Sequence, residues 1–153
     1  MPEGAQLFDE LLRQLCTVVG LPDPEQMVQK RQIQVEGFDV QFDYIDEDPE
    51  AFYLYFQYGI VTAGRTLSIY RLMLEANLLI YAQDQAQFGM DSDTGGIVLL
   101  VRIGLTPEIT GEWLANLMID YAEHGRYWRD QIVQYTDEML EGISNGDYTW
   151  LRA

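Results

Sequence analysis

The sequence has few of the residues on which many protein functions depend. Among its 153 residues are one cysteine (Cys16), one histidine (His124) and one lysine (Lys30). A single cysteine forms no internal disulfide, so we expect a reducing compartment, the cytoplasm. A lone histidine with no second histidine or cysteine nearby does not complete a zinc site, so no metal is expected. For His124 we expect a packing role, and for Cys16 a place in the core.

Long apolar runs and basic residues are also scarce. No run approaches the about 20 residues that a membrane-spanning helix needs, and the first residues, MPEGAQLFDELL, lack the basic and apolar regions of a secretory signal. Nine lysines and arginines stand against 25 aspartates and glutamates, which gives a net charge of −16. Such a field repels nucleic acids and anionic membranes and attracts basic partners. The acidity also serves solubility, and composition does not decide between these roles.

No motif for catalysis or nucleotide binding is present. The sequence has no G-x-G-x-x-G, no P-loop lysine and no G-x-S-x-G. The run DSDTGG from Asp91 to Gly96 resembles the start of a calcium loop, but Arg102 stands where a bidentate carboxylate is required. Neighbouring carboxylates, as in the run DEDPE over residues 46–50, fall in turns where their pKa values shift little. We therefore expect no enzyme activity and no cofactor.

Hydrophobic periodicity predicts helices and antiparallel strands in one domain. Helical spacing of apolar residues covers residues 5–19, 66–81 and a last segment that begins near Thr110, the expected N-cap. Alternation of apolar and polar residues predicts strands over residues 27–36, 38–45, 51–60, 85–91 and 96–104. The order α-βββ-α-ββ-α is typical of an α+β fold with a twisted, mainly antiparallel sheet. The domain is expected over residues 1–140, and the tail over 141–153 is unassigned.

The first two predicted helices carry more apolar surface than one sheet covers. In residues 66–81 the apolar arc spans about 260°, whereas a helix on one sheet needs about 100°. A second copy of the chain is the simplest cover for the remainder, and complete burial within one subunit is the alternative. The helix over 5–19 has a smaller surplus, with Phe8, Leu12 and Val19 expected at its exposed edge.

One run in the second helix resembles a known family. The run LMLEANLL from Leu72 to Leu79 is similar to the L-L-E-A-N-L-L helix of the class I type III secretion chaperones, the Tir-chaperone (CesT/SycE-like) family. The following run QFGMD, the turn TGG, and the closing helix with Trp113 and Trp128 support the resemblance. Element order and acidity agree with it from about residue 5 to about residue 137.

The resemblance implies a bacterial, cytoplasmic homodimer that binds secretion effectors. Such a chaperone holds the N-terminal segment of its effector in an extended form, keeps it soluble and secretion-competent, and meets the secretion ATPase through the complex. In the family the second helix forms the dimer interface, which here places it at Leu67, Tyr70, Met73, Leu74, Asn77, Leu78 and Tyr81. Cargo binds apolar patches on the first helix and the sheet, with a strand added at a sheet edge. The candidates for cargo contact are Phe8, Leu12, Val19, Leu99 and Val101.

Two other functions stay open at this stage. One is a dimeric adaptor that binds proteins with a similar fold but has no role in secretion. The other is an enzyme that binds a small molecule in a pocket lined by Tyr53, Tyr55, Tyr70 and Tyr81. Capture of an effector's N-terminal segment favours the chaperone, whereas a small molecule that copurifies favours the enzyme.

Overall fold

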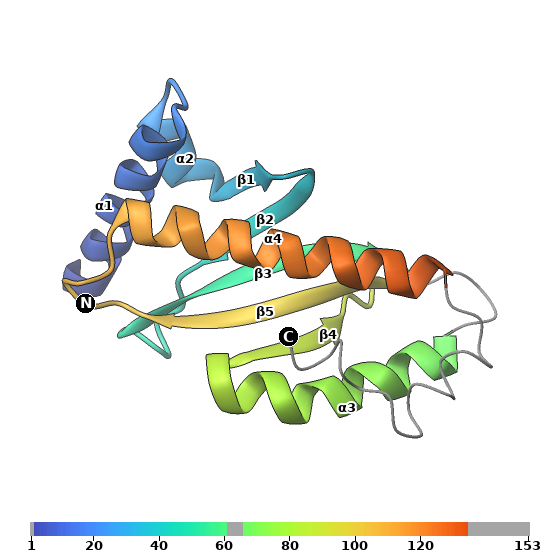
Figure 1. The fold of residues 1–153 in the computed structure, drawn as a ribbon. Coiled ribbons are helices and arrows are strands. Elements are labelled where there is room, and N and C mark those ends of the chain that lie inside the picture. The colour runs from blue at the N-terminus through green and yellow to red at the C-terminus, as the bar shows by residue number, and fades with distance from the viewer. Residues whose placement is uncertain (1, 61–65, 135–153) are drawn as a thin grey trace.

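A five-stranded antiparallel sheet forms the centre of the structure, a computed structural model that describes residues 2–60 and 66–134 (Figure 1). Across the sheet the strands follow the order β1-β2-β3-β5-β4, so that β1 and β4 are its two edges. The α+β class and the antiparallel sheet predicted from the sequence are confirmed. The strands are β1 (Gln32–Val35), β2 (Phe38–Asp43), β3 (Ala51–Ile60), β4 (Ala86–Met90) and β5 (Gly96–Gly104).

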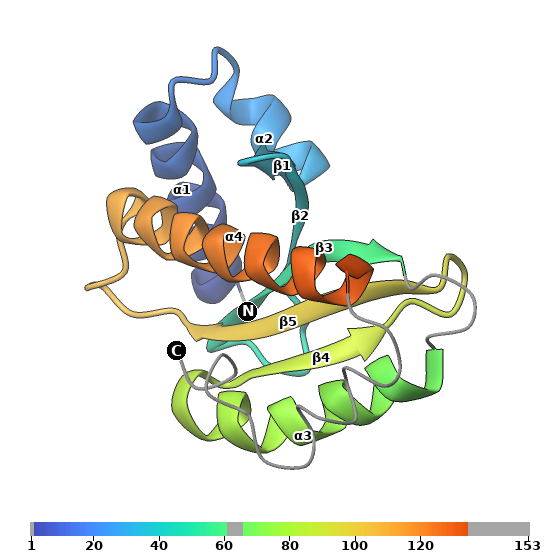
Figure 2. The ribbon, with the colours of Figure 1, turned by 45° about the vertical axis from the view of Figure 1, so that its right-hand side comes forward.

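Helices cover one face of this sheet and one of its edges. Helix α4 runs lengthwise over the sheet, α1 and α2 lie together at one end of it, and α3 lies beside β4 at the edge (Figures 1 and 2). Thr110 caps the start of α4 as predicted, because its Oγ1 accepts a hydrogen bond from the Trp113 amide at 3.1 Å. The helices are α1 (Pro2–Val19), α2 (Pro24–Lys30), α3 (Thr66–Asp84) and α4 (Gly111–Gln134).

Helix α2 corrects the predicted strand over residues 27–36. Asp23 is the N-cap, since its Oδ1 accepts a hydrogen bond from the Gln26 amide at 3.2 Å, and Pro24 occupies the first turn. The helix ends at Arg31, whose φ of 53° is left-handed. Strand β1 therefore begins at Gln32 and is four residues long. The sequence signal for this helix was present in the run Asp-Pro-Glu, a cap followed by proline and an acidic residue.

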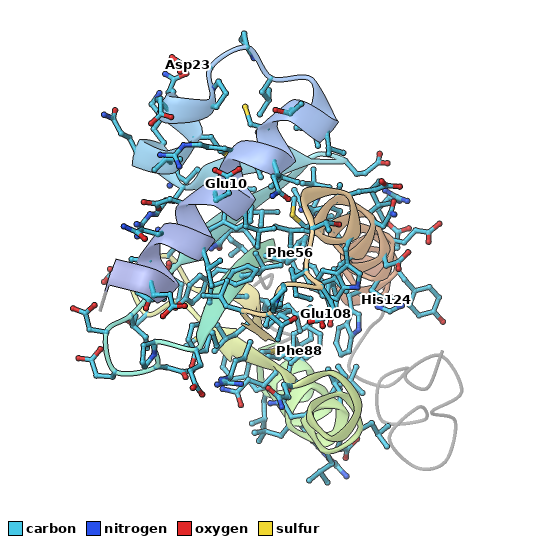
Figure 3. The ribbon with its side chains drawn as sticks, turned by 90° about the vertical axis from the view of Figure 1, so that its left-hand side faces the viewer. Glu10, Asp23, Phe56, Phe88, Glu108 and His124 are labelled. Atoms are coloured by element: carbon cyan, nitrogen blue, oxygen red, sulfur yellow. The ribbon has the colours of Figure 1, made fainter. Side chains whose placement is uncertain are left out.

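The two faces of the sheet differ in their cover. We call the face under α1 and α4 the closed face, and the opposite face the open face. On the closed face, alternate residues of β2, β3 and β5 are buried, with aromatic rings at most positions of β2 and β3: Phe38, Val40, Phe42, Phe52, Leu54, Phe56, Tyr58, Ile97, Leu99, Val101 and Ile103. Figure 3 shows Phe56 and Phe88 among the side chains that fill this interior. The open face carries polar and half-buried residues.

Tyr58 is the point at which α4 is fixed to the sheet. Its side chain is 1% exposed, and its hydroxyl donates a hydrogen bond to the backbone oxygen of Tyr121 in α4 at 2.8 Å. Arg129 of α4 donates from Nε to the Tyr58 carbonyl at 2.9 Å and lies 4.1 Å from the centre of the Phe38 ring. Gly125 lets the helix approach, because a Cβ there would lie 2.6 Å from Cε1 of Tyr58. Gly125 is thus a close-packing position in a continuous α4.

An ion pair between Arg102 and Asp48 connects β5 to the turn that precedes β3, at one end of the open face. Arg102 of β5 donates from Nε to Asp48 Oδ2 at 2.7 Å and from Nη2 to Asp48 Oδ1 at 2.9 Å. The Tyr53 hydroxyl donates to the same Oδ2 at 2.6 Å, and Arg102 Nη1 donates to Gln85 Oε1 at 3.2 Å. These hydrogen bonds, from Arg102 first and from Tyr53 second, lower the pKa of Asp48 to about 2, so the small shift expected for carboxylates of this acidic run is wrong for Asp48.

We predict that Gly125→Ala destabilises the fold by about 1–3 kcal/mol, the usual cost of overpacking a core. The new methyl group would meet the Tyr58 ring, which is wholly buried and has no room to move. Urea unfolding measures the change. Gly89→Ala is the control, because a Cβ at Gly89 meets nothing within 4 Å. Equal or greater stability of Gly125→Ala, the usual result in an exposed helix, would contradict the close packing.

We predict that Asp48 stabilises the fold in a pH-dependent way. The pKa of Asp48 is about 2 in the folded chain and about 3.9 in an unfolded one. The carboxylate therefore contributes stability above about pH 3.9, and this contribution is lost as the pH falls through about 2. In urea unfolding, Asp48→Asn should lie below the wild type at neutral pH, and the gap should narrow in acid. Asp46→Asn, in the same turn but outside these hydrogen bonds, is the control; a gap that stays constant refutes the prediction.

Candidate interaction surfaces

Helix α3 carries a stripe of leucines on its outer side. Leu67, Leu74 and Leu78 are 83%, 70% and 80% exposed. Their spacing of seven and four residues places them within about 40° of one another around the axis and along about 16 Å of helix. We call these three residues the α3 stripe. Exposed apolar residues that gather in a contiguous patch are typical of an interaction surface.

Two other residues predicted at a dimer interface, Met73 and Tyr70, have contacts within the subunit. Met73 is 6% exposed and belongs to the core, so its predicted place at an interface is wrong. Tyr70 is half-buried, and its hydroxyl donates a hydrogen bond to the Met90 sulfur at 2.6 Å. The side chain of Tyr81 lies outside the described residues. The helical wheel predicted the surplus of apolar surface correctly, but it did not separate the side of α3 that meets β4 from the side that is free.

Asn77 closes one edge of the sheet. Its Oδ1 accepts a hydrogen bond from the Phe88 amide at 2.7 Å, and its Nδ2 donates to the Phe88 carbonyl at 3.3 Å. The side-chain amide thus takes the place of a neighbouring strand at the centre of β4. A strand that approached β4 at this position would find both backbone groups occupied. Asn77 therefore holds α3 beside β4 through its amide group, and its place at a dimer interface stays a prediction.

Strand β1 leaves the other edge of the sheet open. It pairs with β2 alone, from Gln32 opposite Gln41 to Val35 opposite Phe38. No further strand lies beside it in the part of the chain that the structure describes. An open edge offers backbone donors and acceptors to an added strand. Of the two sheet edges, β1 is therefore the one that can take a further strand.

Two residues predicted at the exposed edge of α1 are buried. Phe8 and Leu12 are both 0% exposed. The Phe8 ring packs on Phe52 at 5.5 Å and on Tyr44 at 5.8 Å, and the Arg31 guanidinium lies 4.9 Å from its centre. Their exposure was predicted because the apolar arc of the first helix is wider than one sheet covers. Helices α2 and α4 both pack on α1 and cover more of its circumference than one sheet does.

The sheet residues proposed for cargo contact are also buried. Leu99 and Val101 are each 2% exposed, on the closed face beneath α4. The odd-numbered residues of β5 point to the closed face, where packing under the helices leaves their side chains no route to solvent. The prediction that these two side chains meet a partner is wrong. The same strand presents Val98 and Leu100 to the open face, where both are half-buried.

The exposed apolar residues of the first helix lie along its outer side and at its end. Val19 is 41% exposed, in agreement with its predicted position. Gly20, with a φ of 79°, ends the helix and turns the chain so that Leu21 projects beyond it. We call the four exposed residues the α1 patch: Leu7, Val18, Val19 and Leu21, which are 41–49% exposed.

The positive charges of the described chain are largely used internally. Arg13, Arg31, Arg71, Arg102 and Arg126 each form an ion pair with an Asp or Glu of the same chain, at 2.7–3.8 Å between N and O. The remaining acidic residues greatly outnumber the remaining basic ones, so the surface potential is negative. A partner with basic residues is favoured electrostatically by this surface.

The described residues give no support to a metal site or to a tyrosine-lined pocket. Among them, no group of three His, Cys, Asp or Glu side chains is placed to hold a metal ion. His124 is on the exposed side of α4, in edge-to-face contact with the Tyr121 ring at 6.2 Å, and Cys16 is buried in the core as predicted (Figure 3). Of the tyrosines proposed to line one pocket, Tyr55 borders a groove on the open face, whereas Tyr53 and Tyr70 do not, and the side chain of Tyr81 lies outside the described residues.

None of the described helices combines the length and the apolar character that crossing a bilayer demands.

Comparison with known proteins shows a likeness of fold. No family model and no curated protein matches the sequence. A chain from the crystal structure of the ExsC-ExsE complex is similar with a TM-score of 0.64 and 20% identity, over 84% of this chain and 95% of that one. A chain from the structure of the HopA1-SchA chaperone-effector complex is similar with a TM-score of 0.62 and 14% identity, over 82% of this chain and 95% of that one. This chain therefore has the fold of chains found in these complexes.

Proposed function

We propose that this protein is a bacterial, cytoplasmic type III secretion chaperone of the Tir-chaperone (CesT/SycE-like) kind. It binds the N-terminal segment of an effector in an extended form and keeps the effector soluble and secretion-competent. The observation that carries the proposal is the combination of the open β1 edge with the exposed α1 patch. Helices α1 and α2 and strand β1 lie at the same end of the molecule (Figure 1). The likeness to a chain of a chaperone-effector complex supports it.

The two features supply complementary parts of a peptide-binding site. The β1 edge forms backbone hydrogen bonds with an extended cargo strand, which fixes its direction. The α1 patch receives apolar cargo side chains, because Val18, Val19 and Leu21 lie where α1 turns into α2, and α2 leads into β1. An extended segment loses much conformational entropy when it is ordered, so a long contact is needed for tight binding.

Release of the cargo requires work from outside this chain. The sequence has no P-loop lysine and no glycine-rich phosphate-binding motif. We therefore assign the energy for release to the secretion ATPase, which meets the chaperone through the cargo complex. The chain's own contribution is to hold the cargo in a form that the secretion machinery accepts.

The α3 stripe supports a homodimer. Three leucines exposed by 70–83% are poorly placed in water, and burial of each contributes about 1.5–3 kcal/mol. A second copy offers the same stripe, so two stripes pack about a twofold axis and cover each other. Two chains of charge −16 give a dimer of charge −32. This charge speeds the encounter with basic cargo.

We predict that Leu74→Arg disrupts the dimer. The substitution places a charge in the centre of the stripe, where the partner offers only apolar groups. Light scattering after size exclusion should give two chains of 17.7 kDa for the wild type and one chain, or aggregate, for the variant. Ile119→Arg, which changes a 45% exposed residue of α4, is the matched control and should stay dimeric. A wild-type monomer that is folded by circular dichroism refutes the proposed interface.

We predict that Leu21→Arg weakens effector capture while the dimer is kept. The change removes an apolar contact of the α1 patch, and the exposed position lets the fold accept it. Co-expression of the tagged chain with the N-terminal segment of a candidate effector, followed by affinity purification, measures the amount retained. Ile119→Arg is again the control and should retain the effector as the wild type does. The proposal fails if no effector segment is retained, or if a small molecule copurifies instead.

A further inference from the structure

The open face of the sheet holds a groove that the functions proposed above do not use. It has a volume of about 380 Å³ and no residue of α1, α3 or α4 in its lining. This volume is at the lower end of the range for ligand-binding pockets. The lining comes from β2, β3, β5, β4 and the residue after β4: Gln41, Asp43, Tyr55, Gln57, Val98, Leu100, Gln87, Gly89, Met90 and Asp91.

The strand register explains the shape of this groove. Gln41, Tyr55, Leu100 and Gln87 are paired in turn across four strands, so they form one row. Gln57 and Val98 belong to the next row, which ends at Gly89. A Cβ at Gly89 would meet nothing within 4 Å, so the missing side chain leaves the space above this row empty. A row of four strands spans about 14 Å, enough for a short extended peptide.

The chemistry of the groove suits a polypeptide backbone. Val98 and Leu100 form an apolar floor, and both are half-buried. Three glutamine amides, Gln41, Gln57 and Gln87, stand around this floor. Each amide offers two donors and one acceptor, which match the alternating groups of an extended chain. A bound peptide can place an apolar side chain on this floor and form backbone hydrogen bonds with the glutamine amides.

Charge selects the kind of peptide. Asp43 and Asp91 line the groove, and none of the ten lining residues is basic. Arg102, the nearest cation along β5, is already bound to Asp48. A neighbouring groove shares Gln41 and Gln57, and its only cation is Lys30. A second copy of this chain brings a net charge of −16 to an acidic surface, so charge complementarity favours a basic segment over a second copy.

We propose that this open-face groove is a second peptide-binding surface, whose ligand is an extended polypeptide segment with an apolar side chain flanked by lysine or arginine. The groove shares no residue with the α1 patch, the β1 strand or the α3 stripe. The inference therefore stands independently of the proposed function. If both hold, one effector contacts the chaperone on both faces of its sheet.

The test is a titration of the full-length protein with two synthetic peptides, followed by NMR. The probes are Lys-Ser-Leu-Ser-Leu-Ser-Lys and its charge-reversed form Glu-Ser-Leu-Ser-Leu-Ser-Glu, both with blocked ends. The basic peptide should produce saturable shifts of the side-chain amides of Gln41, Gln57 and Gln87. The acidic peptide should leave them unchanged, because it meets Asp43 and Asp91. Equal response to both peptides contradicts the charge argument.

A substitution that fills the groove can be compared with a matched substitution outside it. Gly89→Leu places a side chain in empty space and should keep the fold. We expect it to weaken binding of the basic peptide by more than about tenfold, since the leucine takes the volume that the ligand needs. Gly104→Leu is the control, because Gly104 also has nothing within 4 Å of its Cβ position and does not line the groove. Unchanged binding by Gly89→Leu overturns the proposal.

Two further measurements separate this site from the others. Leu21→Arg should leave the peptide-induced shifts of the three glutamines intact. Loss of effector capture by this variant therefore counts against the α1 patch alone and leaves the groove proposal standing. Shifts confined to the α1 patch or β1 overturn the inference. Groove shifts that depend on protein concentration without peptide, together with a change of mass for Gly89→Leu in light scattering, show that a second copy fills the groove, which also overturns it.

Discussion

The contact between α4 and Tyr58 fixes the arrangement of the whole domain. Tyr58 is buried beneath the helix, its hydroxyl is bound to the Tyr121 carbonyl, and its ring faces the bare Cα of Gly125. A side chain at position 125 would hold the helix away from the sheet. With the helix seated, the aromatic side of β2 and β3 is closed to solvent and to partners. The surfaces that remain for interaction lie elsewhere: the outer sides of α1, α3 and α4, the β1 edge and the open face.

These surfaces have different chemical characters, and the difference assigns them to different partners. The α3 stripe is purely apolar and suits a second copy of itself, whereas the α1 patch adjoins an open strand edge and suits an extended chain. The open face is polar, acidic and hollow. The surface proposed for self-association and the surfaces proposed for cargo thus lie apart on one small domain, and neither proposal excludes the other. Because most arginines are paired internally, the acidic surface favours basic segments at both proposed cargo sites.

Sequence alone predicted those parts of the fold that depend on local periodicity. The strands over 51–60 and 96–104 and the N-cap Thr110 agree with the structure residue by residue. The errors arose where burial depends on elements distant in sequence. Phe8 and Leu12 were expected to be exposed because one sheet covers only part of the helix. They are buried because α2 and α4 also pack on α1. Periodicity measures how much apolar surface a helix has, but the tertiary contacts decide which part of it stays free.

The hydrogen bonds from Asn77 to Phe88 limit how such domains can assemble. A sheet with two open edges can add neighbours on both sides without end, which is the geometry of a fibril. Here one edge is occupied by a side-chain amide of the same chain. Joining through the remaining edge uses up the only free backbone ladder that the described residues present, so growth by strand pairing terminates after a single addition. A continuous sheet of more than two domains therefore cannot form by strand pairing at the edges that the described residues leave free.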